Sequence, residues 1–132
     1  MSCLRAISVA LLLAPLAGQA QWVSYAQTES GSFFLDPGSV RQEGPRTLVW
    51  RLFELQQRRG DGVQSGKALV ELDCAAGSYR YLRTFHYGGS MGHGQYIGSA
   101  AVHPPEPISP GSVVDELARR VCPRPAPSKP AR

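Results

Sequence analysis

The longest alternation of apolar and polar positions along the chain covers residues 46–57. Its apolar side chains fall on both faces of a strand: Leu48, Trp50 and Leu52 on one face, and Val49, Phe53 and Leu55 on the other. Successive side chains of a strand point to opposite faces of the sheet. Apolar residues on both faces therefore predict a central strand that is covered on both sides.

Two further long strands are predicted after a polar turn at residues 58–62. The first covers residues 67–74, and its buried face carries Ala68, Val70, Leu72 and Cys74. The second covers residues 79–87, where alternation places four aromatic residues on one face: Tyr79, Tyr81, Phe85 and Tyr87. Because short turns join the three strands, we expect an antiparallel meander. Shorter runs give weaker strand patterns at 22–26, 32–35, 39–42 and 95–102, and we expect a sheet of about six strands in all.

One helix is predicted near the C-terminus, over residues 113–121. Ser112 suits the N-cap position, and Asp115 follows three residues later in the manner of a capping box. A single stripe of this helix is apolar: Val113, Val114, Leu117, Ala118 and Val121. Pro123 ends the helix. The stripe should pack on the sheet, which would bring Cys122 within reach of Cys74.

The first twenty residues have the pattern of a cleavable signal peptide. Arg5 precedes an apolar run over residues 6–13, Pro15 interrupts it, and small residues at 18 and 20 suit a signal peptidase. The alternative is a transmembrane anchor, but the apolar run is shorter than the roughly 20 residues that a bilayer requires. We therefore expect cleavage after Ala20 and a soluble product that is periplasmic or secreted.

The cysteine count then predicts one disulfide. Cys3 leaves with the signal peptide, so Cys74 and Cys122 remain in an oxidising compartment. The alternatives are two free thiols or one catalytic cysteine. Closing a loop of about 49 residues would stabilise the fold by about 4 kcal/mol on the chain-entropy model. The sequence thus predicts an α+β fold: one domain over residues 21–122, with an antiparallel sheet and a C-terminal helix packed on it and tied to it by the disulfide.

The charge distribution argues against a nucleic-acid partner. The formal net charge of +4 comes from residues outside the domain, because residues 21–122 carry ten basic and ten acidic side chains. A neutral domain lacks the electrostatic footprint of a DNA- or RNA-binding protein. Residues 123–132 are proline-rich and basic, and we expect them to be disordered.

No pattern of catalytic or metal-binding residues stands out. The three histidines, His86, His93 and His103, have no spacing typical of a zinc site. A nucleophile–base pair of Cys74 and His86 conflicts with the disulfide. The glycine-rich run 88–94 lacks the following helix of a phosphate-binding loop, so a wide turn between strands is favoured. We expect no metal and no cofactor.

The four aromatic residues of the 79–87 strand have two interpretations. They could form an exposed stripe that binds sugars or peptides, or they could pack beneath the helix. The second interpretation is favoured, and the binding residues cannot be assigned from the sequence. The sheet edge and the loops at 58–62 and 88–94 are the places where a ligand site is expected.

Several ordered motifs resemble the surface-adhesin protein E family of bacterial exported proteins. They are Trp22, Phe34 to Pro37, Val49-Trp50, Asp73-Cys74, Tyr79-Arg80, Tyr87 to Gly92, Ile108 to Ser112 and Val121-Cys122. The resemblance spans residues 22 to 122. It implies an antiparallel sheet with one C-terminal helix tied by the disulfide, in agreement with the pattern above.

The resemblance also implies a non-enzymatic function. The founding adhesin binds host extracellular-matrix and plasma proteins and is dimeric, so a protein partner is expected and a homodimer is allowed. The founding adhesin is lipid-anchored, whereas here Cys3 precedes the apolar run and no cysteine lies near Ala20. We therefore expect an exported binding protein without a lipid anchor. The alternative is a soluble periplasmic inhibitor or envelope factor on the same scaffold.

Overall fold

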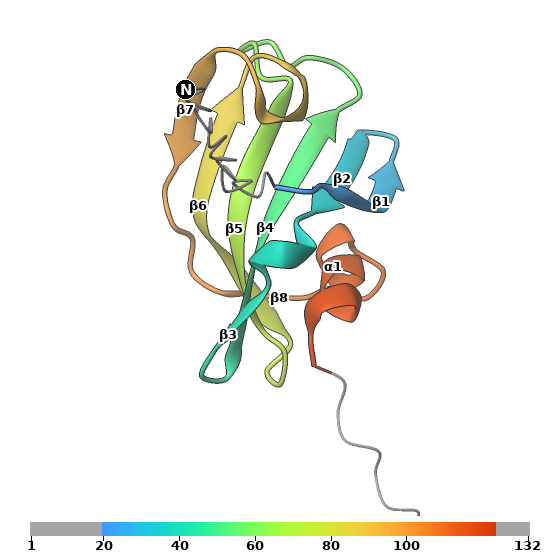
Figure 1. Cartoon of the computed structure of the whole chain (residues 1–132), viewed down its shortest axis with the longest axis vertical. Helices are drawn as coiled ribbons and strands as arrows, with labels where there is room; N and C mark the ends of the chain where they lie inside the picture. Colours follow the sequence, from blue (N-terminus) through green and yellow to red (C-terminus); the bar gives the residue numbers. More distant parts are fainter. Residues whose placement is uncertain (1–19, 124–132) are drawn as a thin grey trace, which may run out of the picture.

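The computed structural model describes residues 20–123, and every structural statement below concerns this part of the chain (Figure 1). Almost all of the predicted signal peptide and of the predicted disordered tail lie outside it. Those two predictions are therefore untested by the structure.

The described residues form a single antiparallel sheet and one α-helix (Figure 1). The strands are β1 (Val23–Thr28), β2 (Gly31–Leu35), β3 (Arg41–Glu43), β4 (Arg46–Leu55), β5 (Ser65–Asp73), β6 (Ser78–Tyr87), β7 (Tyr96–Ala100) and β8 (Glu106–Pro107), and the helix is α1 (Val113–Val121). The main sheet order is β1-β2-β4-β5-β6-β7, with β3 paired to β4 and β8 paired to β6. Short 3-10 helices lie at η1 (Pro37–Ser39) and η2 (Ser90–Gly92).

The sheet contains eight strands, so the expected number of about six is corrected. The unexpected strand is β8, where Ser78 pairs with Pro107 and Tyr79 with Glu106. Proline has no N–H group for a strand ladder, and the surrounding segment is rich in proline. Local sequence therefore gives no strand signal there, and the pairing depends on the position of β6.

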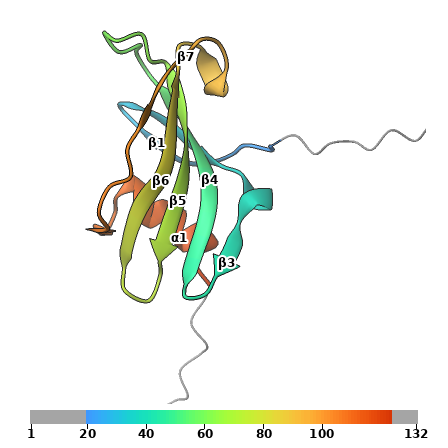
Figure 2. The same ribbon diagram turned by 90° about the vertical axis from the view of Figure 1, so that its left-hand side faces the viewer.

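The core lies between the sheet and α1, which sits below β1 and β2 in Figure 1. Val49, Val70 and Leu72 of the central strands pack with Leu117 and Val114 of the helix. This arrangement confirms the central position of β4 and the apolar stripe of the predicted helix. On the opposite face the described residues place no α-helix, and the short 3-10 helices η1 and η2 lie on that side instead (Figure 2).

The ends of α1 are fixed as the sequence predicts. At its N-terminus, the Ser112 side chain accepts a hydrogen bond of 3.1 Å from the backbone N–H of Asp115. The Asp115 carboxylate in turn accepts one of 2.8 Å from the N–H of Gly111. Just beyond the last helical residue, Cys122 forms a disulfide with Cys74, which follows β5. The helix is thus linked covalently to the central sheet.

A β-bulge in β6 overturns one prediction. Leu69 pairs with Arg83, but the next residue of β5, Val70, pairs with Tyr81, so Leu82 is an extra residue in β6. An extra residue reverses the alternation of the side chains beyond it. The prediction that four aromatic residues share one face is therefore wrong. Tyr79 and Tyr81 pack against the core beneath α1, and Phe85 and Tyr87 lie on the opposite face.

Candidate binding surface

The face of the sheet opposite α1, hereafter the outer face, is arranged by the pairing of β4, β5 and β6. In one row across these strands, Trp50 pairs with Leu69, and Leu69 pairs with Arg83. In the next row, Leu52 pairs with Lys67, and Lys67 with Phe85. Directly paired residues point to the same face, so aromatic and basic side chains from three strands meet in a small area.

Aromatic rings form a continuous group on this face. The Trp50 and Phe85 rings are nearly parallel, with an interplanar angle of 16° and centroids 6.2 Å apart. The ring of Tyr96, on the edge strand β7, lies 6.4 Å from Phe85 and 6.1 Å from Tyr87. Tyr96 is 55% exposed. We call Trp22, Trp50, Phe85, Tyr87 and Tyr96 the aromatic surface, since Trp22 lines the same groove.

The groove on the aromatic surface has a volume of about 310 Å³. Its lining residues are Ala20, Trp22, Asp36, Trp50, Lys67, Phe85 and Tyr87. Large rings that remain partly exposed beside a few charged groups are typical of surfaces that bind a partner. Four of these lining residues are aromatic and two are charged.

Two basic side chains lie at the aromatic surface without an acidic partner. The Nζ atom of Lys67 lies 5.6 Å from the centroid of the Tyr87 ring. Arg83 is exposed. In the part of the chain that the structure describes, neither side chain forms an ion pair with a carboxylate. Both charges are therefore available to an anionic ligand.

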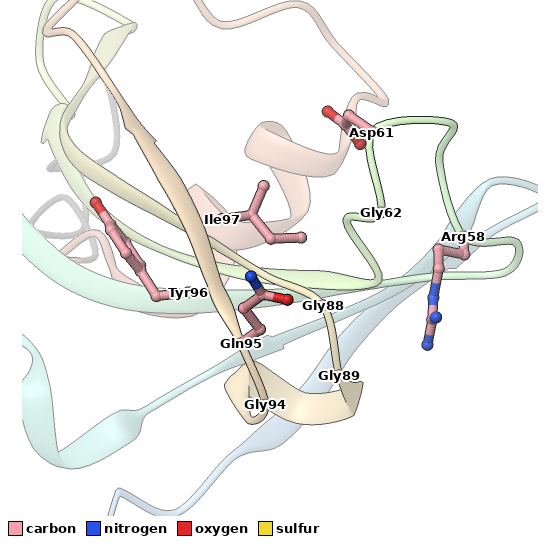
Figure 3. A pocket seen from close by; sticks show the side chains of 9 residues that line it. All are labelled: Arg58, Asp61, Gly62, Gly88, Gly89, Gly94, Gln95, Tyr96 and Ile97. Atoms are coloured by element: carbon pink, nitrogen blue, oxygen red, sulfur yellow. The ribbon is translucent and has the colours of Figure 1, made fainter.

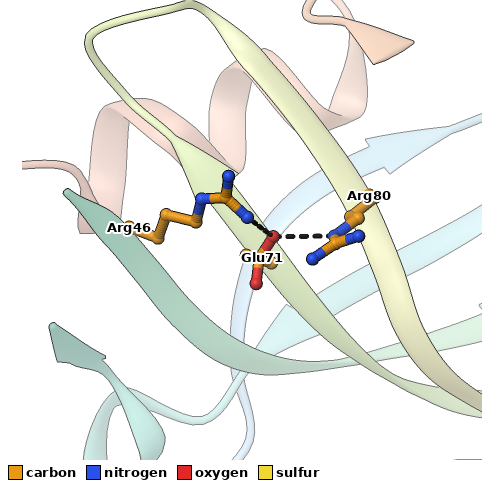
Figure 4. A network of polar contacts seen from close by, with 3 residues as sticks. All are labelled: Arg46, Glu71 and Arg80. Atoms are coloured by element: carbon orange, nitrogen blue, oxygen red, sulfur yellow. Dashed lines mark hydrogen bonds and ion pairs between the residues drawn. The ribbon is translucent and has the colours of Figure 1, made fainter. Parts of the chain in front are cut away.

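The lower end of the outer face carries a network of three charged residues (Figure 4). One carboxylate oxygen, Oε1 of Glu71, accepts from Arg46 at 2.8 Å and from Arg80 at 2.7 Å. Burial raises the pKa of the Glu71 carboxyl, but the hydrogen bonds and charges of Arg80 and Arg46 outweigh this effect, and the pKa is lowered overall. The network links the starts of β4 and β6 to β5. It contains no acid and base placed to exchange a proton with a ligand.

Arg51 lies on the inner face, among aromatic rings. Its guanidinium carbon is 4.6 Å from the centroid of Tyr81 and 5.6 Å from that of Phe33. Burial raises the pKa of the Tyr25 and Tyr81 hydroxyls, and the positive charge of Arg51 partly opposes that change. Stacking of a cation between rings joins β2, β4 and β6 and serves the fold.

A second hollow, of about 460 Å³, lies between the loops at 58–62 and 88–97 (Figure 3). Its two charged lining residues, Arg58 and Asp61, do not converge in the view of Figure 3. Asp61 is instead paired with Arg59 at 2.6 Å, and this hydrogen bond lowers the pKa of Asp61 to about 2. The sequence points to these loops as places for a ligand site, and this stays a prediction; Tyr96 of the aromatic surface also lines this hollow.

Glycines close the 88–94 loop. The N–H of Gly89 donates to the His93 carbonyl at 3.0 Å, and the N–H of Gly88 donates to the Gln95 carbonyl at 2.8 Å. A Cβ at Gly94, where φ is +84°, would lie 2.9 Å from the nitrogen of Gly89. The run connects β6 to β7 through η2, which confirms the wide turn and leaves no helix N-terminus for a phosphate.

The histidines are dispersed. The His86 ring lies edge-on to Phe53, the His103 ring lies edge-on to Tyr81, and His93 is in the glycine-rich loop. Burial and the charge of Arg59 lower the pKa of His86. Within residues 20–123, no group of three or more His, Cys, Asp or Glu side chains could hold a metal ion.

A comparison with models of protein families shows which family the chain belongs to. A family model described as "Surface-adhesin protein E" matches residues 22–123. The chain belongs to the surface-adhesin protein E family. A search of curated proteins finds no match.

Solved structures of Haemophilus influenzae protein E share the fold of this protein E family member. The selenomethionine form is 14% identical, with a TM-score of 0.62 over 84% of this chain and 92% of that chain. Crystal form II is 18% identical, with a TM-score of 0.60 over 89% and 96% of the two chains. A structure from a non-typeable strain is 16% identical, with a TM-score of 0.58 over 82% and 79%. At these identities the likeness shows the fold alone.

Sequence reasoning did not find the aromatic surface of this protein E family member. The sequence pattern places Trp50 on a buried strand face, and it places Phe85 and Tyr87 on one face with the tyrosines that lie beneath α1. Only the bulge at Leu82, which the pairing of β5 with β6 reveals, brings Phe85 to the side of Trp50.

No described helix is long and apolar enough to cross a bilayer.

Proposed function

We propose that this protein is an exported, non-enzymatic binding protein that holds a host or matrix protein on its outer face. The proposal is supported by family membership and by one structural observation. Five aromatic side chains from β4, β6, β7 and the segment before β1 gather beside two unpaired basic groups. Aromatic and basic residues are enriched where proteins bind partners.

The non-enzymatic part of the proposal rests on where the titrating groups lie. Among the described residues, Asp61 and Glu71 are the carboxyl groups whose pKa is clearly lowered. In each case an arginine partner explains the change. Such pairs shift a pKa for structural reasons as readily as for catalysis. Cys74 is held in the disulfide and is not a free nucleophile in this structure.

Location is the first part of the test. Intact source cells are treated with a protease, and the protein is then detected by immunoblot. Degradation on intact cells supports a surface or secreted binding protein. Protection until the outer membrane is opened contradicts the proposal and favours the soluble periplasmic inhibitor or envelope factor.

Binding is the second part, and it can be assigned to the outer face. Purified residues 21–132 are applied to immobilised host matrix and plasma proteins, and binding is compared with that of Tyr96→Ala. Tyr96 is 55% exposed, so its loss should weaken binding without unfolding the domain. Val102→Ala is a matched control, because Val102 is 54% exposed and lies beyond the end of β7, outside the aromatic surface. Equal binding by all three proteins would contradict the assignment of the face.

A further inference from the structure

The charge on the outer face differs from that of the domain as a whole. Residues 21–122 are neutral, yet Lys67 and Arg83 lie unpaired at the aromatic surface, and Glu71 is shared by two arginines below them. Two carboxylates lie near them and are engaged by backbone groups: Glu54 accepts a hydrogen bond of 2.8 Å from the N–H of Met91, and Asp36, which lines the groove, accepts one of 3.0 Å from the N–H of Gly38. Neither carboxylate forms an ion pair with Lys67 or Arg83 in the described residues, so both basic groups can interact with an anion.

The positions of the basic and aromatic groups alternate. Lys67 pairs with Phe85 and Leu69 with Arg83, so Lys67 and Arg83 are diagonal neighbours on β5 and β6. Diagonal neighbours are about 7–8 Å apart and within reach of each other's long side chains. Two like charges at this separation repel each other, and an anionic group between them would remove that repulsion. The rings of Trp50 and Phe85 lie on either side of the same strand, β5.

This combination selects among ligand classes. Aromatic rings that remain partly exposed, as those of Trp50 and Phe85 do, offer apolar area to the C–H face of a sugar ring. Lysine and arginine beside it would bind a sulfate or carboxylate group on the same sugar chain. The chain's own tail is a poor occupant, because Arg124, Lys129 and Arg132 carry the same sign as Lys67 and Arg83. A neutral apolar peptide would leave both basic groups unused.

We propose that the outer face binds an acidic glycan chain, with a sugar ring on Trp50 and Phe85 and its sulfate or carboxylate group on Lys67 and Arg83. This inference rests on the proposed function and deepens it. The glycan would be the part of the host matrix that the protein recognises.

The test uses heparin as the probe and purified residues 21–132. Calorimetry at about 50 mM salt should detect binding that weakens as salt is raised, since released counterions contribute to it. Lys67→Ala/Arg83→Ala should reduce the affinity at least about tenfold, and Trp50→Ala should reduce it by a similar factor. Arg58→Ala/Arg120→Ala is the matched control, because it removes the same charge from the loop after β4 and from α1, away from the paired positions of Lys67 and Arg83 on β5 and β6. Circular dichroism and thermal unfolding show whether each variant is folded.

Three results would overturn the proposal. One is the absence of heparin binding to the folded wild-type domain. Another is an equal loss of affinity in the two double variants, which would show only non-specific attraction. The third is tighter binding of a single-stranded oligonucleotide that depends on the same three residues, Trp50, Lys67 and Arg83.

A last comparison separates this inference from the proposed function. Host matrix is treated with enzymes that remove its sulfated glycan chains, and binding of the wild-type domain is measured before and after. Loss of binding supports the glycan. Retained binding, with the same dependence on Tyr96, rejects the glycan and keeps a protein partner. No binding to either matrix sample rejects both proposals.

Discussion

At the scale of single residues, Glu71 is the most constrained carboxylate described. Its side chain is 12% exposed and its Oε1 atom accepts from two arginines that belong to different strands. Arg46 and Arg80 are more exposed, so each pair by itself would contribute little in water. Sharing one mostly buried oxygen makes the three residues a unit, and removing the acid would leave two positive charges facing each other.

Glu71 should contribute to the loss of stability in acid. Its pKa is lowered in the folded state from a usual value of 4.5, so the unfolded chain takes up the proton first as the pH falls. Its contribution is therefore present above pH 4.5 and is lost as the pH falls through the lower, folded-state pKa. In urea titrations across this range, Glu71→Gln should show a shallower decline in the free energy of unfolding than the wild type. Glu43→Gln removes an exposed ion pair and should follow the wild type; a wild-type slope in Glu71→Gln would contradict the account.

Gly94 is a residue where the backbone demands glycine. Its φ of +84° and the 2.9 Å approach to the Gly89 nitrogen leave no space for a methyl group. Gly94→Ala should lower the free energy of unfolding by about 1–3 kcal/mol. Gly60→Ala is the control, because no atom lies within 4 Å of its added Cβ. Chemical denaturation of both variants measures the difference, and equal stability would show that the loop adjusts freely.

At the scale of elements, the sequence predicts those whose patterns are local. The strands β4 and β5 and the helix α1 follow from alternation, capping residues and an apolar stripe. The short β8 does not, because its two residues pair only where β6 reaches them. The faces of β6 were predicted incorrectly for the same reason: the extra residue Leu82 is defined by the register against β5, which alternation within one strand does not contain.

The candidate surface could not be predicted for a related reason. Trp50 and Phe85 lie 35 positions apart in the sequence and meet only through two strand pairings. Lys67 and Arg83 each have the pattern of an ordinary solvent-facing charge. What distinguishes them is their position as diagonal neighbours without a carboxylate partner in the described residues, and that depends on the whole sheet.

The disulfide joins two elements that are distant in sequence. Cys74 and Cys122 are separated by 48 positions, so the bridge restricts the unfolded chain strongly. Replacing both by serine should lower the free energy of unfolding by about 4 kcal/mol on the chain-entropy model. Guanidinium titrations of the oxidised wild type and the double variant measure this. If the double variant has the same free energy of unfolding as the oxidised wild type, the bridge does not stabilise the fold as described.

At the scale of the whole molecule, the two faces of the sheet carry different sets of side chains. The inner face packs with α1 and is held by the disulfide, and the outer face presents aromatic and basic groups beside a groove of about 310 Å³. Because α1 stabilises the sheet from one side, the other side can keep partly exposed rings. Under the proposed function the outer face would contact the partner, while Leu48 and Leu52 of the same face stay buried in the fold.

The central claim is that the outer face contacts the partner. Site-specific photocrosslinking tests it directly, with a photoreactive residue at position 96 on β7 or, as a control, at position 120 on α1. Each labelled protein is exposed to host matrix proteins and irradiated. The account predicts crosslinked partners from position 96 and few from position 120. Crosslinks confined to position 120 would contradict it.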